Sequence, residues 1–252
     1  LEFRRVLFRS NAEYERVNYD RAIEALRLNS GSGNDRFYLD DNSAVTTINM
    51  GSGNDKLQVG QLFGSLRAVP EVAPGDGIST VQTTRGYLSR GISFATTVLA
   101  GGDNDTMTVY GNQAALNLFG EDGNDEIVIR AFALVGGGVG TSQTNVNGGT
   151  GADHIEYNVN APVTLDGGGG VDTVVVVGTE FADNFVITRD SIFGAGLFVN
   201  LVAIERLEVD GAKGDDHFFI LSTNPSVVTA VIGGLGSDTF DVSGDVVGSI
   251  AS

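Results

Sequence analysis

The chain has 252 residues, of which 41% are hydrophobic and 19% charged, so it is long enough and apolar enough to fold around a core. Acidic residues outnumber basic ones by 32 to 15, and the net charge of −17 argues against nucleic acid or an anionic membrane as partner and favours a cation. No apolar run approaches a membrane span, which predicts no membrane insertion, and the lack of cysteine excludes disulfides, thiolate zinc sites and cysteine nucleophiles. Its 36 glycines accompany only four prolines without a three-residue period, which excludes collagen.

The first ten residues, LEFRRVLFRS, form a separate segment. Read codon by codon they correspond to a common sequencing-adapter oligonucleotide, so residues 1–10 are predicted to be an assembly artefact. We therefore expect the true amino terminus, including any secretion signal, to lie elsewhere. The ending VVGSIAS predicts a carboxyl side that is also cut.

Eight turns of one type then follow along the chain, with the frame G-G-x-G-x-D followed by an apolar residue one position after next. Their aspartates are Asp35, Asp55, Asp105, Asp125, Asp153, Asp172, Asp216 and Asp238. The copies that begin at Gly148, Gly167 and Gly233 keep every fixed position, with the inner glycines Gly149, Gly151, Gly168, Gly170, Gly234 and Gly236. Most gaps between the aspartates are one or two units of roughly 20 to 22 residues, which predicts a repeat architecture.

Short β-branched or aromatic runs surround these turns and predict strands. Ile23 to Leu28 could form a helix by propensity, but IEALRLNSGSGNDRF aligns without a gap with IERLEVDGAKGDDHF from Ile204, so we predict a strand there. Residues 60–95 contain no turn motif and are expected to be an irregular insertion between the first coils, residues 11–59, and the main region, residues 96–252. After Asp172 the apolar runs recur every 11 residues, so each coil should hold two short strands.

The predicted fold is therefore all-β: a parallel β-solenoid with coils of about 20–22 residues. Coils of equal length stack their apolar faces into one continuous core. We assign to that core the apolar residue two positions after each aspartate, namely Phe37, Leu57, Met107, Ile127, Ile155, Val174, Phe218 and Phe240.

The turns themselves have the chemistry of a calcium site. Glycine allows positive φ, so backbone carbonyls can converge, and the aspartate adds a formal charge. Calcium takes six to eight oxygen ligands, and two stacked turns could each supply half of them. The spacing predicts four pairs: Asp35 with Asp55, Asp105 with Asp125, Asp153 with Asp172, and Asp216 with Asp238.

The nonapeptide resembles the calcium-binding repeats of repeats-in-toxin (RTX) proteins, whose turns form a parallel β-roll. The resemblance implies that the aspartates and turn carbonyls of the complete copies, at Asp153, Asp172 and Asp238, are calcium ligands, and that Asp35, Asp55, Asp125 and Asp216 act likewise in incomplete turns. Two departures weaken the pattern: Asp103 replaces the third glycine before Asp105, and GTEFAD before Asp183 keeps only its first glycine, so Asp183 is not expected to be a ligand. Because the motif falls on about every second strand, we expect all the motif turns on one edge.

Three function classes remain open from the sequence. The first is a calcium-binding, non-catalytic repeat module of a secreted or surface protein, extracellular and of bacterial type, with cell-surface or matrix components as adhesive partners. The second is a β-helix enzyme acting on polysaccharides, a lyase or epimerase, or its accessory module, which would need Arg67, Arg85 and Arg90 to converge. The third is a metal-free spacer in which glycine and aspartate only build turns. A phosphate loop is excluded because GGGGVD is followed by valines rather than a helix.

Overall fold

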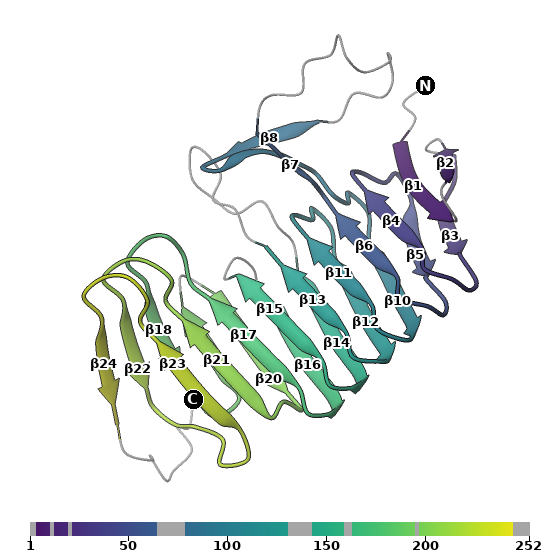
Figure 1. Cartoon of the computed structure of the whole chain (residues 1–252). Helices are drawn as coiled ribbons and strands as arrows, with labels where there is room; N and C mark the ends of the chain where they lie inside the picture. Colours follow the sequence, from purple (N-terminus) through teal and green to yellow (C-terminus); the bar gives the residue numbers. More distant parts are fainter. Residues whose placement is uncertain are drawn as a thin grey trace.

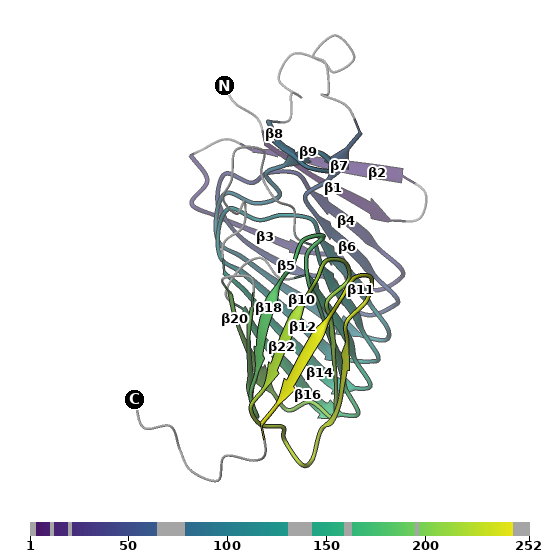
Figure 2. The same ribbon diagram turned by 90° about the vertical axis from the view of Figure 1, so that its left-hand side faces the viewer.

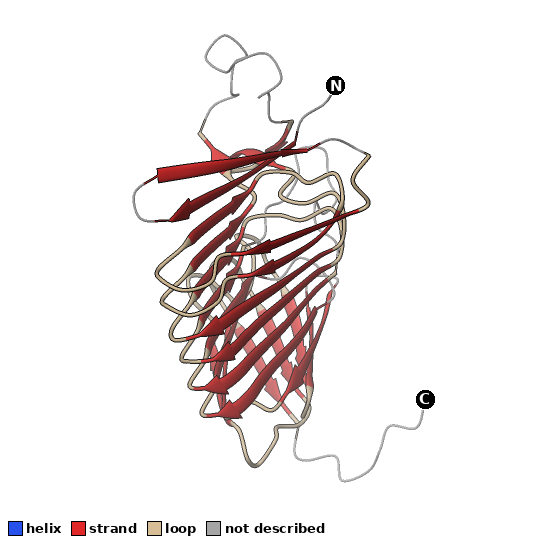
Figure 3. Ribbon diagram, turned by 90° about the vertical axis from the view of Figure 1, so that its right-hand side faces the viewer, coloured by secondary structure: helices blue, strands red, loops and turns tan. Residues whose placement is uncertain are grey.

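The structure is a computed structural model, which describes residues 4–10, 13–19, 22–64, 79–130, 143–158, 163–194 and 197–243. No helix occurs in these ranges (Figure 3). The molecule is a β-solenoid whose coils stack in a single row (Figure 1). The predicted all-β parallel solenoid is confirmed. In the part of the chain that is described, no helix is long and apolar enough to cross a membrane.

Two long sheets face one another across the core (Figure 2). Sheet A contains, in spatial order, β2 (Glu13–Tyr19), β1 (Arg4–Ser10), β4 (Arg36–Leu39), β6 (Lys56–Val59), β11 (Thr106–Val109), β13 (Glu126–Ile129), β15 (His154–Asn158), β17 (Thr173–Val177), β21 (Arg206–Asp210) and β23 (Val228–Ile232). Sheet B contains β24 (Thr239–Val242), β22 (His217–Ile220), β18 (Asn184–Ile187), β19 (Ser191–Gly194), β20 (Leu197–Val202), β16 (Val163–Gly170), β14 (Thr144–Gly151), β12 (Leu116–Asp122), β10 (Thr96–Gly102), β5 (Val45–Asn49) and β3 (Ala25–Asn29).

Pairing between successive coils is parallel and follows the repeat. Met107 lies opposite Leu57 and Ile127, and Ile155 lies opposite Val174, so the apolar residue that follows each turn keeps one register. The strand predicted from Ile23 is β3, which pairs in parallel with β5. Among the described strands, antiparallel pairing occurs in three places: between β7, β8 and β9, between β18, β19 and β20, and at β1, which pairs with β2 and β4.

The core lies between the two sheets and is made of the predicted column plus its partners from sheet B. Seven of the eight predicted column residues are buried, with at most 2% exposure: Phe37, Leu57, Met107, Ile127, Ile155, Val174 and Phe218. Phe240 is the exception at 45% exposure, because β24 is the outermost strand of sheet B and its ring is covered from one side only. Phe185, Phe218 and Phe240 stack with ring centroids 5.1 and 4.9 Å apart.

The segment predicted to be an irregular insertion includes a small antiparallel sheet, sheet C, of β7 (Leu62–Phe63), β9 (Gly86–Ser89) and β8 (Thr80–Thr83). It leaves the solenoid between β6 and β10 without interrupting it, since β6 pairs directly with β11 and β5 with β10.

The buried Asn42 side chain hydrogen-bonds to the neighbouring coil at this edge. Its Oδ1 accepts the backbone N–H groups of Ser93 and Phe94, each at 2.8 Å.

After β17 the edge of the solenoid on which the motif turns lie changes. The chain adds the antiparallel hairpin strands β18, β19 and β20 to sheet B before it returns to sheet A at β21, so this coil takes 33 residues from Asp172 to Glu205. The gap of 44 residues between Asp172 and Asp216 is therefore not two coils in one column, as the spacing predicted. The motif turns before β18, β22 and β24 lead from sheet A to sheet B, whereas all earlier ones lead from sheet B to sheet A.

Candidate metal centre in the aspartate turns

The motif turns form two columns on opposite edges of the solenoid, which overturns the expectation of a single edge. The first column holds Asp35, Asp55, Asp105, Asp125, Asp153 and Asp172, and Glu205 continues it. The second column holds Asp183, Asp216 and Asp238. In Figure 1 the first column lies along the lower right side and the second at the upper left.

Within each column the aspartates form one continuous ladder rather than separate pairs. The backbone N–H of each aspartate donates to Oδ1 of the aspartate in the next coil, at 2.7 Å from Asp35 to Asp55, 2.7 Å from Asp55 to Asp105 and 2.8 Å from Asp125 to Asp153. The predicted neighbours, such as Asp153 and Asp172 at 2.9 Å, are adjacent in it. So are Asp55 and Asp105, which lie 50 residues apart in the sequence, because the insertion leaves at the other edge.

A second ladder runs in the opposite direction at the residue before each aspartate. Oδ1 of Asn34 accepts the N–H of Asn54 at 2.9 Å, and Oδ1 of Asn104 accepts the N–H of Asn124 at 2.8 Å. The sequence carried a signal for it, the asparagine that precedes the aspartate in each of the first four turns, to which we assigned no role. Glu205 was also missed: its Oε2 accepts the N–H of Asp172 at 2.8 Å, in place of an aspartate.

Close stacking of the turns explains the glycines. The second and fourth motif positions have positive φ, for example 94° at Gly168 and 143° at Gly170. A Cβ atom at Gly170 would lie 1.5 Å from the carbonyl oxygen of Gly151, and one at Gly236 would lie 1.7 Å from that of Gly214. The glycines predicted at Gly149, Gly151, Gly168, Gly170, Gly234 and Gly236 all share this positive φ and this contact with the turn before.

Where glycine is missing the backbone keeps its conformation. Asp103 replaces the third glycine before Asp105 and has φ of 76°, and Glu121 and Ala212 at the second position have φ of 71° and 67°. Such conformations cost a non-glycine residue on the order of 1 kcal/mol or more. The repeat therefore imposes its turn geometry even on residues that disfavour it.

The second carboxylate oxygen of the ladder is the unusual feature. Among the described residues, Oδ2 is buried and has no hydrogen-bond partner in Asp35, Asp55, Asp105, Asp125, Asp153, Asp172 and Asp216. These side chains are at most 4% exposed. In the later turns Oδ2 lies against the first motif glycine, since a Cβ at Gly148 would be 2.3 Å from Oδ2 of Asp153. An unpaired buried oxygen of this kind costs free energy unless a proton or a cation satisfies it.

The electrostatics of the ladder follow from this burial. Burial raises the pKa of Asp105 to about 7, and repulsion from Asp125 and Asp55 adds to the effect. Burial likewise raises the pKa of Asp55 and of Asp125 to about 6. For Asp153, Asp172 and Asp216 the pKa is also raised, first by burial and then by neighbouring carboxylates. These six carboxylates are therefore stabilised by a proton or a cation.

Asp183 differs from the other members. Its Oδ2 accepts the N–H of Thr179 at 2.7 Å, within its own turn. Its own backbone N–H donates to Oδ1 of Asp216 at 2.8 Å. This residue was not expected to be a ligand, and its Oδ2 already accepts a hydrogen bond from the protein.

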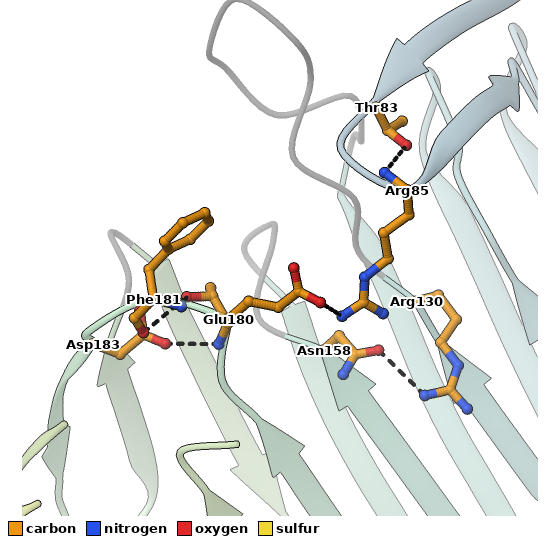
Figure 4. Close-up of polar contacts among 8 residues, drawn as sticks. Thr83, Arg85, Arg130, Asn158, Glu180, Phe181 and Asp183 are labelled. Atoms are coloured by element: carbon orange, nitrogen blue, oxygen red, sulfur yellow. Dashed lines mark hydrogen bonds and ion pairs between the residues drawn. The ribbon is translucent and has the colours of Figure 1, made fainter. Parts of the chain in front are cut away.

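The arginines that an enzyme would gather have separate partners. Arg85, in the turn between β8 and β9, reaches Glu180 at 2.5 Å, in the same turn as Asp183 (Figure 4). Arg90 donates to Gln113 at 3.3 Å, and Arg67 lies outside the described residues. His154 and His217 both begin strands just after a motif aspartate, and His217 Nε2 lies 2.7 Å from Asp241 Oδ2.

Comparison with known proteins adds no assignment. No family model matches the chain, and no curated protein matches its sequence.

Proposed function

We propose that this chain is a calcium-binding β-solenoid of a secreted or surface repeat protein, non-catalytic, in which the ion satisfies the aspartate ladder. The observation that carries the proposal is the set of buried Oδ2 atoms without hydrogen-bond partners, stacked in successive coils. Calcium prefers carboxylate and carbonyl oxygens and tolerates irregular geometry. Extracellular calcium is in the millimolar range that suits weak sites, which is why we place the protein outside the cell.

The donor set fits a hard cation. Each of seven turns offers one carboxylate oxygen without a hydrogen bond, and its glycine-rich backbone brings carbonyls close to the neighbouring turn. Some of these carbonyls already accept hydrogen bonds, such as Gly51 O from Gly102 N at 2.9 Å. The residues that would hold the ion are therefore the ladder aspartates and the remaining carbonyls of their turns, together with water.

A metal-free spacer is the second candidate, and the Oδ1 hydrogen bonds favour it. These bonds, with the asparagine ladder beside them, already join every turn to the next. In that case the carboxylates stay partly protonated near neutral pH, because burial raises the pKa of Asp105 to about 7.

The substitution Asp105→Asn separates the two functions. Asparagine keeps the Oδ1 acceptor, removes the charge and replaces Oδ2 by an amide, so without metal its Tm should equal or exceed that of the wild type. With millimolar calcium the wild type should gain about 2.7 kcal/mol for each site at a hundredfold excess over Kd. The variant should lose part of that gain, as measured by thermal unfolding with and without chelator. Asp183→Asn is the matched control, because Oδ2 of Asp183 is already hydrogen-bonded.

Titration calorimetry in two buffers of different ionisation enthalpy gives an independent reading. Calcium that displaces protons from carboxylates with pKa values of about 6 to 7 should release a fraction of a proton for each ion at pH 7. A wild type with no calcium-dependent change in Tm and no heat of binding would leave the spacer as the function.

A further inference from the structure

The outer face of sheet B carries an uncharged polar track that no turn motif explains. Across six neighbouring strands, residues directly opposite one another point away from the core and are half-buried: Thr47, Thr97, Asn117, Asn145, Thr164 and Asn200. Oδ1 of Asn117 accepts a hydrogen bond from Nδ2 of Asn145 at 2.8 Å. The track therefore offers hydroxyl and amide groups at the spacing between strands, about 4.8 Å, over a straight line.

An aromatic stripe adjoins this track on the later strands. Phe219, Val186, Phe193 and Phe198 lie opposite one another in turn across β22, β18, β19 and β20. Phe193 and Phe198 are 44% and 41% exposed, with ring centroids 5.0 Å apart. Stripe and track overlap on β20, where Phe198 and Asn200 lie two residues apart and point to the same side.

The track itself is uncharged, although the protein has a net charge of −17: it contains no ionisable side chain between Arg27 at its outer end and Asn200. Asp166 lies beside the track on the same face, two residues from Thr164, and its Oδ2 accepts a hydrogen bond from Nδ2 of Asn147 at 2.8 Å. An anionic polymer would be repelled by the molecule as a whole, and a cationic one would find no row of carboxylates along the track. Exposed aromatic rings beside uncharged donors and acceptors suit a ligand with apolar C–H faces and hydroxyl edges.

We propose that the outer face of sheet B binds a linear neutral polysaccharide, with Phe193 and Phe198 stacking on sugar rings and the Asn117–Asn145–Asn200 part of the track binding hydroxyl groups. A polymer that repeats along its length matches a surface that repeats along the solenoid axis. This goes beyond the proposed function by naming a ligand class for the adhesive role expected from the sequence. It rests on the proposed function only insofar as calcium maintains the fold.

Affinity electrophoresis tests the proposal with the whole chain in native gels that contain mixed-linkage glucan, galactomannan or dextran, with alginate as the anionic comparison. We expect at least one neutral polymer to retard the wild type and alginate not to. Phe193→Ala with Phe198→Ala should weaken the retardation roughly tenfold or more, since both rings that would stack on sugar are removed. Phe181→Ala removes an equally large ring that is 66% exposed on a motif turn, and it should bind as the wild type does.

Circular dichroism of each variant, with calcium and with chelator, shows that the fold is present, which separates failure of this proposal from failure of calcium binding. Folded protein that no neutral polymer retards, or that loses retardation equally in the Phe181 variant, overturns the proposal. Light scattering after gel filtration tests whether a second copy of the chain occupies the aromatic stripe instead. A wild-type dimer that the double variant converts to a monomer would assign the stripe to self-association and would also overturn the polysaccharide proposal.

Discussion

The two columns of turns use the same nonapeptide with different results. In the first column six aspartates and Glu205 form an unbroken row, and the asparagine ladder accompanies its first four turns. In the second column Asp183 is satisfied within its own turn, and Asp238 precedes the exposed final strand. The difference teaches that the motif specifies a turn, whereas the row of unsatisfied oxygens comes from stacking several turns without interruption.

The largest expected effect comes from filling the space between two turns. Gly170→Ala places Cβ 1.5 Å from the carbonyl oxygen of Gly151 at a φ of 143°, so we expect a loss of about 3 kcal/mol or more and a Tm roughly 10 °C lower. Gly169→Ala is the control, because its nearest atom would be 4.0 Å away. Gly236→Ala, in the outermost turn of the second column, should cost less, because that coil has neighbours on one side only. Equal losses at Gly169 and Gly170 would contradict the close stacking.

The next effect concerns calcium affinity. Asp153→Ala and Asp172→Ala should each weaken calcium binding by about tenfold, and by similar amounts, because their carboxylates are adjacent in one row and both Oδ2 atoms are unpartnered. Asp183→Ala in the second column should leave the calcium affinity within about twofold of the wild-type value, because Oδ2 of Asp183 already accepts a hydrogen bond. Isothermal titration calorimetry measures all three. If only one of the first two variants loses affinity, the ion is not shared between these turns.

The pH dependence of the calcium-free protein should also reflect the buried carboxylates of the ladder. A carboxyl group whose pKa is higher in the folded state than in the unfolded state stabilises the protein fully when the pH is below the unfolded-state pKa. That stabilisation is lost as the pH rises through the folded-state pKa. With pKa values of about 6, 7 and 6 at Asp55, Asp105 and Asp125, stability should fall between pH 5 and pH 8 by about 1 to 3 kcal/mol for each group. Thermal unfolding in chelator measures this fall.

Calcium should reverse that dependence, since the ion requires ionised carboxylates and its affinity drops on acidification. Asp105→Asn should flatten the calcium-free profile, because it removes one of the carboxyl groups whose pKa is raised by burial. A calcium-free protein that is more stable at pH 8 than at pH 5 would be inconsistent with a ladder of buried carboxylates.

The smallest effect is expected where sheet C meets the second column. Arg85 and Glu180 are 55% and 42% exposed, so their ion pair is screened by solvent. Arg85→Ala should lower the free energy of unfolding by no more than about 0.5 kcal/mol, within roughly 2 °C in Tm. A larger loss would show that sheet C braces the solenoid rather than lying against it.

Much of the fold could be predicted because its signals are local and repeated. The offset from Asp105 to Met107 recurs at every turn, and seven of the eight residues at that offset are buried. The site was harder to predict. That Oδ1 and Oδ2 have different surroundings depends on the register between coils, which no single turn encodes. The position of Asp55 beside Asp105 depends on where the insertion leaves the solenoid.

The two-column arrangement escaped prediction for a related reason. A step of 11 residues separates Asp172 from Asp183, and the sequence shows the step without showing which sheet each strand joins. The hairpin of β19 and β20 makes the difference, because it adds antiparallel strands to sheet B where a simple coil would have crossed to sheet A. The sequence of β19, from Ser191 to Gly194, has no feature that distinguishes this hairpin strand from the other short strands.

The 33-residue coil also bears on how such a chain can lengthen. When genetic duplication adds an even number of strand-sized segments, every later turn stays on the same edge of the solenoid as the earlier ones and extends the same row of carboxylates. An odd number moves all later turns to the opposite side and starts a new row. A lineage could thus redistribute its charge between two flanks, and end one row while beginning another, without altering a single motif residue.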